Sequence, residues 1–216
     1  MRKSSRTVVR RSKKKSGKKN DDPFFVLKDD PESKRELLKA ALELFVHRGP
    51  SEPTVRQIAA RAGYSNPAIF KYFPSKDELA IYLFRQCWER VTAELRAAIQ
   101  PDQSFRDGLI ALLEAYANIV EEDLDAFIYA RENIRRFCEF LSPKSQKQHP
   151  GILLRQLFEK GKRTGEINSD VDIEMLAAAV GGLFSQFSNL LYWGECSRSR
   201  SDWLPSMRRV IFKMCE

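Results

Sequence analysis

The sequence lacks the residue patterns that mark most enzymes and metal-binding proteins. Its 4 cysteines are far apart and form no CxxC pair, so they indicate neither a metal site nor a disulfide framework. Its 2 histidines, His47 and His149, belong to no HExxH motif, and neither a phosphate-binding glycine loop nor a nucleophile elbow occurs. We therefore predict no catalytic residues, no bound metal and no cofactor.

Two further patterns are missing. No apolar run approaches the ~20 residues that cross a membrane, and the N-terminus has no apolar centre of the kind found in secretory signals. No stretch alternates apolar and polar residues for long enough to predict a strand, whereas almost every segment after Pro31 has helical periodicity. The sequence therefore predicts an all-α, cytoplasmic protein of about nine helices with no membrane partner.

Acidic residues are absent from positions 1–20, which hold ten lysines and arginines. The net charge of +8 is concentrated there and in residues 33–76, where eight basic residues stand against three acids, while residues 77–216 are net acidic. A localised basic region favours a polyanionic partner such as nucleic acid, although a solvated surface would also account for the charge alone. We interpret residues 1–30 as a disordered basic N-terminal arm with its linker.

Capping and helix-ending signals divide the region that follows into short helices. Gly49 ends the first helix, Gly63 supplies the left-handed residue that ends the second, and Pro74 stops the third. Ser65 is a suitable N-cap for that short third helix. Three capping boxes mark the other helix starts, and they are Ser33 with Glu36, Thr54 with Gln57, and Ser75 with Glu78.

The two short helices over residues 55–62 and 66–73 each carry one apolar face. In the second, Ile69, Phe70 and Phe73 gather on the side expected to enter the core. Two such helices joined by a glycine-containing turn form a helix-turn-helix, whose second helix enters the DNA major groove. The opposite side, expected to face DNA, holds Pro67, Ala68, Lys71 and Tyr72.

The stretch TVRQIAARAGYSNPAIFKYFPSKDEL, residues 54–79, resembles the DNA-binding segment of the TetR/AcrR family of bacterial transcription regulators. The resemblance implies a helix-turn-helix DNA-binding domain over residues 31–78, followed by an effector-binding and dimerisation domain over residues 79–216. The matching elements are Thr54, IAARAGYS at 58–65, Ile69, YF at 72–73 and SKDEL at 75–79.

The resemblance also implies roles for single residues. Phosphate contacts position such a protein on DNA, whereas base contacts specify the sequence. Pro67 replaces a residue more usual in the family, so it and Asn66 are expected to alter which bases are read. A helical wheel places Asn66 nearer the core side. The residues implied for phosphate contact are Thr54, Tyr64, Tyr72 and Lys76, and those implied at or near base edges are Arg56, Ser65, Asn66, Ala68 and Lys71.

Helical periodicity predicts five helices in the rest of the chain. The last two resemble the dimerisation helices of the family, which form a four-helix bundle in the homodimer. A core within one chain is the alternative explanation of their apolar faces. A dimer fits DNA recognition because two copies read half-sites about 34 Å apart, one turn of DNA. The predicted helices span 104–122, 124–141, 150–164, 172–193 and 202–215.

Aromatic residues in the second domain are candidates for an effector pocket. An apolar pocket with one polar anchor is a common small-molecule site. Plain core is the alternative explanation of each of these residues, and it is the one that the sequence favours. The candidates are Tyr116, Phe127 and Tyr129, with Arg131 as the polar anchor.

Together these features predict a sequence-specific, homodimeric transcriptional repressor that a small-molecule effector releases from a palindromic operator in double-stranded DNA. Such a protein would be cytoplasmic and associated with the bacterial nucleoid. The alternative is a non-specific, nucleoid-organising DNA-binding protein driven by the basic arm over residues 1–20. The choice between repressor and activator stays open.

Overall fold

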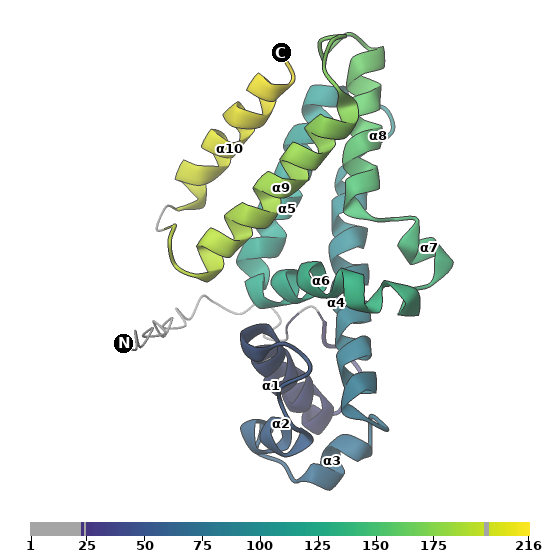
Figure 1. Cartoon of the computed structure of the whole chain (residues 1–216), viewed down its shortest axis with the longest axis vertical. Helices are drawn as coiled ribbons and strands as arrows, with labels where there is room; N and C mark the ends of the chain where they lie inside the picture. Colours follow the sequence, from purple (N-terminus) through teal and green to yellow (C-terminus); the bar gives the residue numbers. More distant parts are fainter. Residues whose placement is uncertain (1–22, 24, 197–198) are drawn as a thin grey trace, which may run out of the picture.

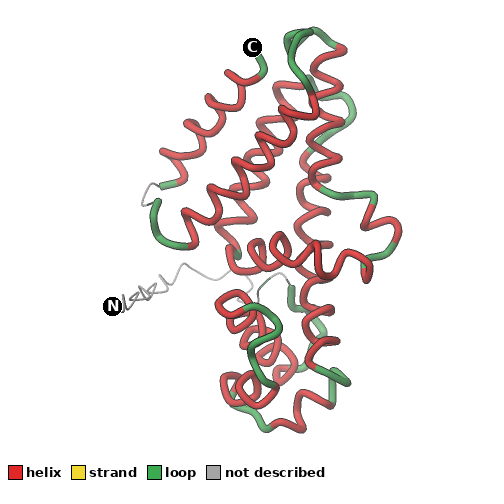
Figure 2. The backbone as a smooth tube through the Cα atoms, in the orientation of Figure 1, coloured by secondary structure: helices red, strands yellow, loops and turns green. Residues whose placement is uncertain are grey.

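The structure is a computed structural model that describes residues 23, 25–196 and 199–216, and these residues form helices with no strand (Figure 2). This confirms the predicted all-α fold. The basic arm 1–20 lies outside the described residues. The elements in the described part are α1 (Glu32–Arg48), α2 (Val55–Ala62), α3 (Asn66–Phe70), α4 (Lys76–Ala98), α5 (Phe105–Glu122), α6 (Leu124–Phe137), the 3-10 helix η1 (Cys138–Phe140), α7 (Pro143–Gln146), α8 (Pro150–Arg163), α9 (Ile173–Tyr192) and α10 (Arg200–Met214).

The helices are arranged as two bodies that share α4 (Figure 1). Helices α1, α2 and α3 surround the first turns of α4, which spans 23 residues and continues into the second body. There α5, α8, α9 and α10 form a bundle, and α6 lies across α4 at the junction. The long α4 therefore joins the N-terminal unit directly to the bundle.

Two hydrophobic clusters stabilise these bodies. The first contains Phe45 and Phe84, and the second contains Phe158. Helix α6 contributes to both, since Tyr129 belongs to the first cluster and Phe127 to the second. Because burial of apolar surface is the main favourable term in folding, α6 is held on both sides, and a displacement of α6 must disturb both clusters.

The predicted ends of the second helix are confirmed. The Thr54 hydroxyl accepts a hydrogen bond from the Gln57 N–H at 3.2 Å, and the Gln57 side chain accepts one from the Thr54 N–H at 2.8 Å, which completes the capping box. Gly63 has φ 78°, the left-handed conformation that glycine adopts without strain. At α4, the Ser75 side chain accepts the Glu78 N–H, so that half of the predicted box is present.

The predicted capping box at Ser33 is wrong. Helix α1 begins at Glu32 after Pro31, which fixes its own φ near the helical value, and no side chain caps this end. The Ser33 hydroxyl instead forms a hydrogen bond with the Tyr72 hydroxyl at 2.6 Å. A partner 39 residues away therefore takes the side chain that the local pattern assigned to a cap.

Helix ends in the second body differ from the predicted ones by a few residues. The helix expected to reach residue 141 ends as α-helix at Phe137 and tightens into η1, and the expected loop after it contains α7. Asp123 separates α5 from α6 by accepting the Ala126 N–H, which explains a boundary without glycine or proline. Burial, with the nearby acids Asp125 and Glu122, raises the pKa of Asp123 to about 6.

Part of the segment predicted as linker packs on the first body. Phe25 and Val26 are buried in its cluster. The Arg35 side chain donates to the backbone oxygens of Asp30 and Lys28, which ties this segment to the first turn of α1. The packed core of the N-terminal unit therefore begins before Pro31, because apolar side chains within an acidic stretch still find a buried site.

Candidate nucleic-acid interface

Helices α2 and α3 form the predicted helix-turn-helix on the surface of the first body. Ile58 and Ala59 of α2 are buried, as are Ile69 of α3 and Phe73 just after it. The turn between the helices is closed by the Gly63 and Tyr64 N–H groups, which donate to carbonyls of the last turn of α2. The small side chain of Ala59 allows the close crossing of the two helices.

The opposite side of this unit is open to solvent. Ser65, Asn66, Pro67 and Lys71 are exposed, and Ala68 is half-buried. Ser65 is the N-cap of α3 by its backbone conformation, but its side chain makes no capping hydrogen bond. The expectation that Asn66 turns toward the core is wrong, because the first residue of a helix lies at the edge of the packed unit.

Thr54 and Arg56, the two predicted DNA contacts of α2, are also exposed. Thr54 holds the first turn through its capping box, so its hydroxyl is already engaged. Arg56 lies two residues further on, in the first turn of α2. Arg61, in the last turn of the same helix, forms an exposed ion pair with Glu43 of α1 at 2.7 Å.

The burial of Phe70 was predicted wrongly. Its side chain is 54% exposed, while Ile69 and Phe73 fill the core beneath α3. Phe70 lies about 100° around α3 from Ile69, whereas Phe73 follows α3 and is held beside Ile69, whose backbone oxygen accepts its N–H at 2.9 Å. Ile69 and Phe73 therefore share the buried side, and Phe70 does not.

Tyr72, a predicted phosphate contact, is half-buried and fixed in place. Its hydroxyl is bonded to Ser33 at the start of α1, and the ammonium of Lys71 lies 5.3 Å from its ring centroid. Tyr64 is also half-buried, and both tyrosines pack against the first hydrophobic cluster. A tyrosine hydroxyl both donates and accepts, so the Ser33 bond leaves Tyr72 able to contact a phosphate.

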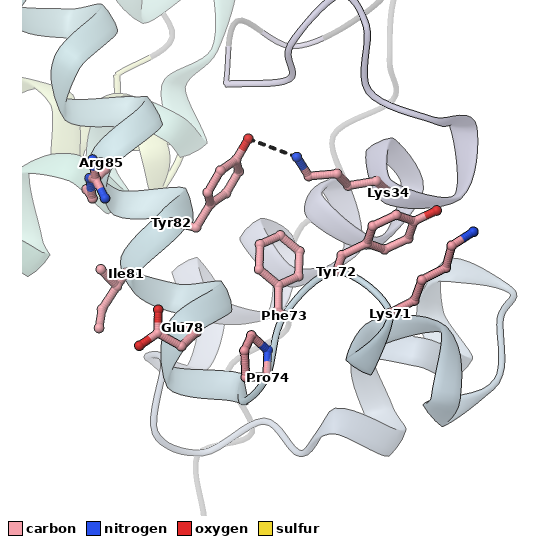
Figure 3. A pocket seen from close by; sticks show the side chains of 9 residues that line it. All are labelled: Lys34, Lys71, Tyr72, Phe73, Pro74, Glu78, Ile81, Tyr82 and Arg85. Atoms are coloured by element: carbon pink, nitrogen blue, oxygen red, sulfur yellow. Dashed lines mark hydrogen bonds between the residues drawn. The ribbon is translucent and has the colours of Figure 1, made fainter.

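A hollow of about 390 Å³ lies beside α3, between α1 and the first turns of α4 (Figure 3). Lys34 enters it from α1, donating to the Asp30 carboxylate at 2.6 Å and to the Tyr82 hydroxyl at 3.1 Å. This pairing neutralises Lys34, so Lys71 and Arg85 are the lining cations that form no ion pair among the described residues. The lining residues are Lys34, Lys71, Tyr72, Phe73, Pro74, Glu78, Ile81, Tyr82 and Arg85.

Lys76, the last predicted phosphate contact, lies at the first turn of α4. Its ammonium donates to the backbone oxygen of Ser51 at 2.6 Å, in the loop before α2. An ammonium has three donors, so two remain for a phosphate. The start of α4 and the start of α2 are thereby held next to each other.

The four predicted effector-pocket residues are not gathered around one hollow. Tyr116 and Phe127 pack edge to face, with ring centroids 5.5 Å apart, and Phe184 of α9 stacks on Tyr116 at 4.6 Å. Tyr129 packs instead in the first cluster against Phe45, and its hydroxyl donates to the backbone oxygen of Ala80 on α4.

Arg131 lies at the junction of α6 and α9. Its guanidinium donates to the Asn189 side chain and pairs with Glu132 at 3.0 Å. Its Nε is buried and has no hydrogen-bond partner among the described residues. Burial raises the pKa of nearby Tyr116, and the positive charge of Arg131 opposes that shift.

Neither histidine is placed for catalysis. The Nδ1 atom of His47 is hydrogen-bonded to the Tyr192 hydroxyl at 2.7 Å, which links α1 to the end of α9. His149 is the N-cap of α8, where its Nδ1 accepts the Gly151 N–H. Within the described residues no three His, Cys, Asp or Glu side chains could hold a metal ion together.

One face of α9 is apolar and uncovered. Met175 and Trp193 are 67% and 68% exposed, and the small residues Ala179 and Gly182 between them are exposed as well. Met175, Ala179 and Gly182 are spaced by four and three residues, which places them on one stripe, and Trp193 follows Gly182 by eleven residues, about three helical turns, at the end of α9. In the described part of the chain, α9 is the one helix that is long and apolar enough to cross a membrane, judged by length and composition alone. The sequence had predicted no apolar run of that length. Only 22% of the apolar window of α9 is buried, so most of its apolar surface is open in the single chain.

The fold and this interface define a helix-turn-helix DNA-binding protein with a second, all-helical domain. Residues 37–83 match the family model described as bacterial regulatory proteins, tetR family. The regulator YdgC of Bacillus subtilis strain 168 is 26% identical over 164 residues, which are 73% of this chain and 80% of YdgC. The transcriptional activator FasR of Mycolicibacterium smegmatis is 32% identical over 102 residues, so the match spans 47% of each chain.

Among solved structures, a tetR-family regulatory protein from Rhodococcus RHA1 superposes with a TM-score of 0.71. It is 21% identical, and the match covers 86% of this chain and 98% of that one. The shared fold extends through both bodies, whereas the family model matches only the N-terminal unit. The chain belongs to the TetR family of helix-turn-helix transcriptional regulators, which act on DNA and are not enzymes.

Proposed function

We propose that this regulator is a homodimer that binds a palindromic operator, with α3 of each copy in the major groove of one half-site. The observation that carries the proposal is the two-sided α3 region. Ile69 and Phe73 anchor it, while Asn66, Pro67 and Lys71 are open to solvent. A short anchored helix with a polar, cationic outer side can approach base edges without unfolding.

The proposed contacts divide into two groups. Lys71, Asn66 and Ser65 on α3 face the bases, together with Arg56, Pro67 and Ala68. Thr54, Tyr64, Tyr72 and Lys76 flank them and contact phosphates. The residues that contact phosphates fix the orientation of the protein on DNA. Two of them are themselves held by hydrogen bonds within the chain, Tyr72 to Ser33 and Lys76 to Ser51.

The uncovered face of α9 supports a dimer. On α10 the apolar residues Val210 and Met214 are exposed as well. Large apolar patches left open on one chain mark interaction surfaces, and small residues such as Gly182 permit close helix approach. A second copy of the same face satisfies two-fold symmetry and pairs α9 and α10 into a four-helix bundle.

The proposed effector is a small, mostly apolar molecule that enters between α5, α6 and α9. Tyr116, Phe127 and Phe184 meet there, and the unpartnered Nε of Arg131 offers one donor to a polar group. Tyr129 lies on the other side of α6, so it would not contact the effector and would respond only to a movement of α6. An effector shifts operator affinity only by preferring one spacing of the two half-site readers.

We propose repression as the regulatory sense, in the bacterial cytoplasm at the nucleoid. A protein that occupies an operator and leaves it when an effector binds lowers transcription by default. FasR, the relative matched over about half its length, is named an activator, so transcription measured with and without the protein at its own operator decides this point.

The central test uses DNA recovered by selecting bound genomic fragments. Lys71→Ala and Tyr72→Ala should each lower operator affinity about tenfold, the first through a lost base contact and the second through a lost phosphate contact. Mobility shift measures the affinity, and circular dichroism confirms folding. Lys144→Ala, which removes an exposed charge on α7, is the control. Unchanged affinity in both variants would remove the basis of the proposal.

A non-specific DNA-organising role is the second candidate, favoured by the ten basic residues in positions 1–20. Deleting these residues separates the two functions. A specific regulator keeps its sequence preference and loses part of its affinity and salt sensitivity, whereas a non-specific binder loses nearly all binding.

A further inference from the structure

Ser51, in the loop between α1 and α2, is held by cations from two distant helices. Its backbone oxygen accepts a hydrogen bond from the Lys76 ammonium at 2.6 Å, and its hydroxyl accepts one from the Arg136 guanidinium at 2.6 Å. Lys76 begins α4, and Arg136 lies near the end of α6, 85 residues along the chain from Ser51. Ser51 thus connects the start of α4, which is proposed to face DNA, to α6, the helix that contributes to both hydrophobic clusters.

The loop around Ser51 has little conformational freedom, so a movement of Ser51 is passed on to the residues that follow it. Pro50 and Pro53 on either side are buried, and each proline fixes its own φ. Thr54 follows directly and caps α2, so the first N–H groups of α2 take their direction from this loop. A shift of Ser51 therefore moves both the start of α2 and the ammonium of Lys76.

We propose that Arg136 is a positioning residue for DNA binding. Through the hydroxyl of Ser51 it fixes, from α6, the loop that aims Lys76 and the start of α2 at the operator phosphates. Arg136 does not contact DNA itself. This assignment rests on the proposed operator binding and adds the route by which α6 acts on it.

The two other roles open to Arg136 make different predictions. Arg136 is exposed, so a direct phosphate contact would lower the salt slope of binding by about 1 when its charge is removed. If Arg136 only attracted DNA through its charge, removing another cation nearby would lower operator affinity by the same amount. Arg135, the adjacent residue of α6, is exposed and has no bond to Ser51, so Arg135→Gln removes the same charge without the contact.

The experiment is a double-mutant cycle on operator affinity, using the full chain and the variants Ser51→Ala, Arg136→Gln and their combination. Ser51→Ala keeps the carbonyl that binds Lys76 and removes only the acceptor for Arg136. Each single change should weaken operator binding about threefold to tenfold, the range for one lost hydrogen bond. The double variant should be no weaker than the weaker single variant, with the salt slope of the wild type.

Two controls complete the cycle. Ser51→Thr retains the hydroxyl and should bind as the wild type does, and Arg135→Gln should change affinity less than twofold. Thermal unfolding of every variant shows whether the fold is intact. If Arg136→Gln unfolds, Ser51→Ala with Ser51→Thr tests the same bond from the other side, since position 51 is exposed.

Additive losses, a salt slope reduced by about 1 in Arg136→Gln, or an equal loss in Arg135→Gln would each overturn the assignment. A Ser51→Ala variant that binds as tightly as the wild type would also do so. These results differ from failure of the proposed function, in which the wild-type chain itself shows no preference for the selected operator over unrelated DNA.

Discussion

The N-terminal unit and the α9 face use apolar residues in opposite ways. In the first, Ile58, Ile69 and Phe73 are buried by other elements of the same chain. On α9, Met175 and Trp193 are mostly exposed although this helix is the most apolar one described. The DNA-binding unit is thus packed within one chain, whereas the α9 face would be buried only by a second molecule, as in the proposed dimer.

The glycines draw the same contrast. A β-carbon at Gly161 of α8 would lie 2.6 Å from Cγ of Phe105 and 2.9 Å from Ile167, closer than packed atoms approach. A β-carbon at Gly181 or Gly182 of α9 would meet nothing within 4 Å. Gly161 is required by the core of its own chain, and Gly182 has a structural reason only if another molecule approaches it.

The largest expected effect comes from breaking the proposed partner surface. Gly182→Arg places a long charged side chain in the centre of the α9 stripe without touching the chain's own core. The variant should be a monomer by light scattering, and operator affinity should fall at least about 100-fold because one half-site reader replaces two.

The control for this variant is Gln156→Arg, an equal gain of charge at an exposed position of α8. It should remain dimeric and bind the operator as the wild type does. A Gly182→Arg variant that is still a dimer with full affinity would place the interface elsewhere and leave the exposed stripe of α9 unexplained.

The contrast also explains what the sequence could predict. Thr54 with Gln57 and Gly63 mark the helix-turn-helix because caps and left-handed glycines are local, and a local pattern survives folding. Ser33 carries the same kind of pattern, yet its hydroxyl bonds to Tyr72, a contact that depends on how α1 and α3 pack. Local chemistry was predictable, and long-range competition for the same side chain was not.

The candidate pocket shows the same limit on a larger scale. Tyr116 of α5 and Tyr129 of α6 both lie on the apolar side of a predicted helix. In the structure, however, Tyr116 is buried in the second cluster and Tyr129 in the first. Helical periodicity indicates that a residue is buried, and it cannot say in which of two cores. The bond between Arg136 and Ser51 was missed for the same reason, since nothing local to residue 51 indicates a partner on α6.

A smaller effect distinguishes the glycines of the two regions. Gly161→Ala should lower the free energy of unfolding by about 1 to 3 kcal/mol, because the new methyl overpacks against Phe105. Gly181→Ala, about 100° around α9 from Gly182 and off the proposed seam, should raise it by up to about 1 kcal/mol through helix propensity. Denaturant unfolding at one protein concentration compares them, and a destabilised Gly181→Ala would show that something packs on that side too.

The smallest effect tests whether the DNA-binding unit is as complete as its burial indicates. Phe70→Gln replaces a large ring, but because that ring is 54% exposed, the free energy of unfolding should change by no more than about 0.5 kcal/mol. Ile69→Val removes one buried methylene next to it and should cost about 0.5 to 1.5 kcal/mol. If Phe70→Gln proves the more costly of the two in denaturant unfolding, the ring is buried after all, and the outer side of α3 is not free to meet DNA as the structure draws it.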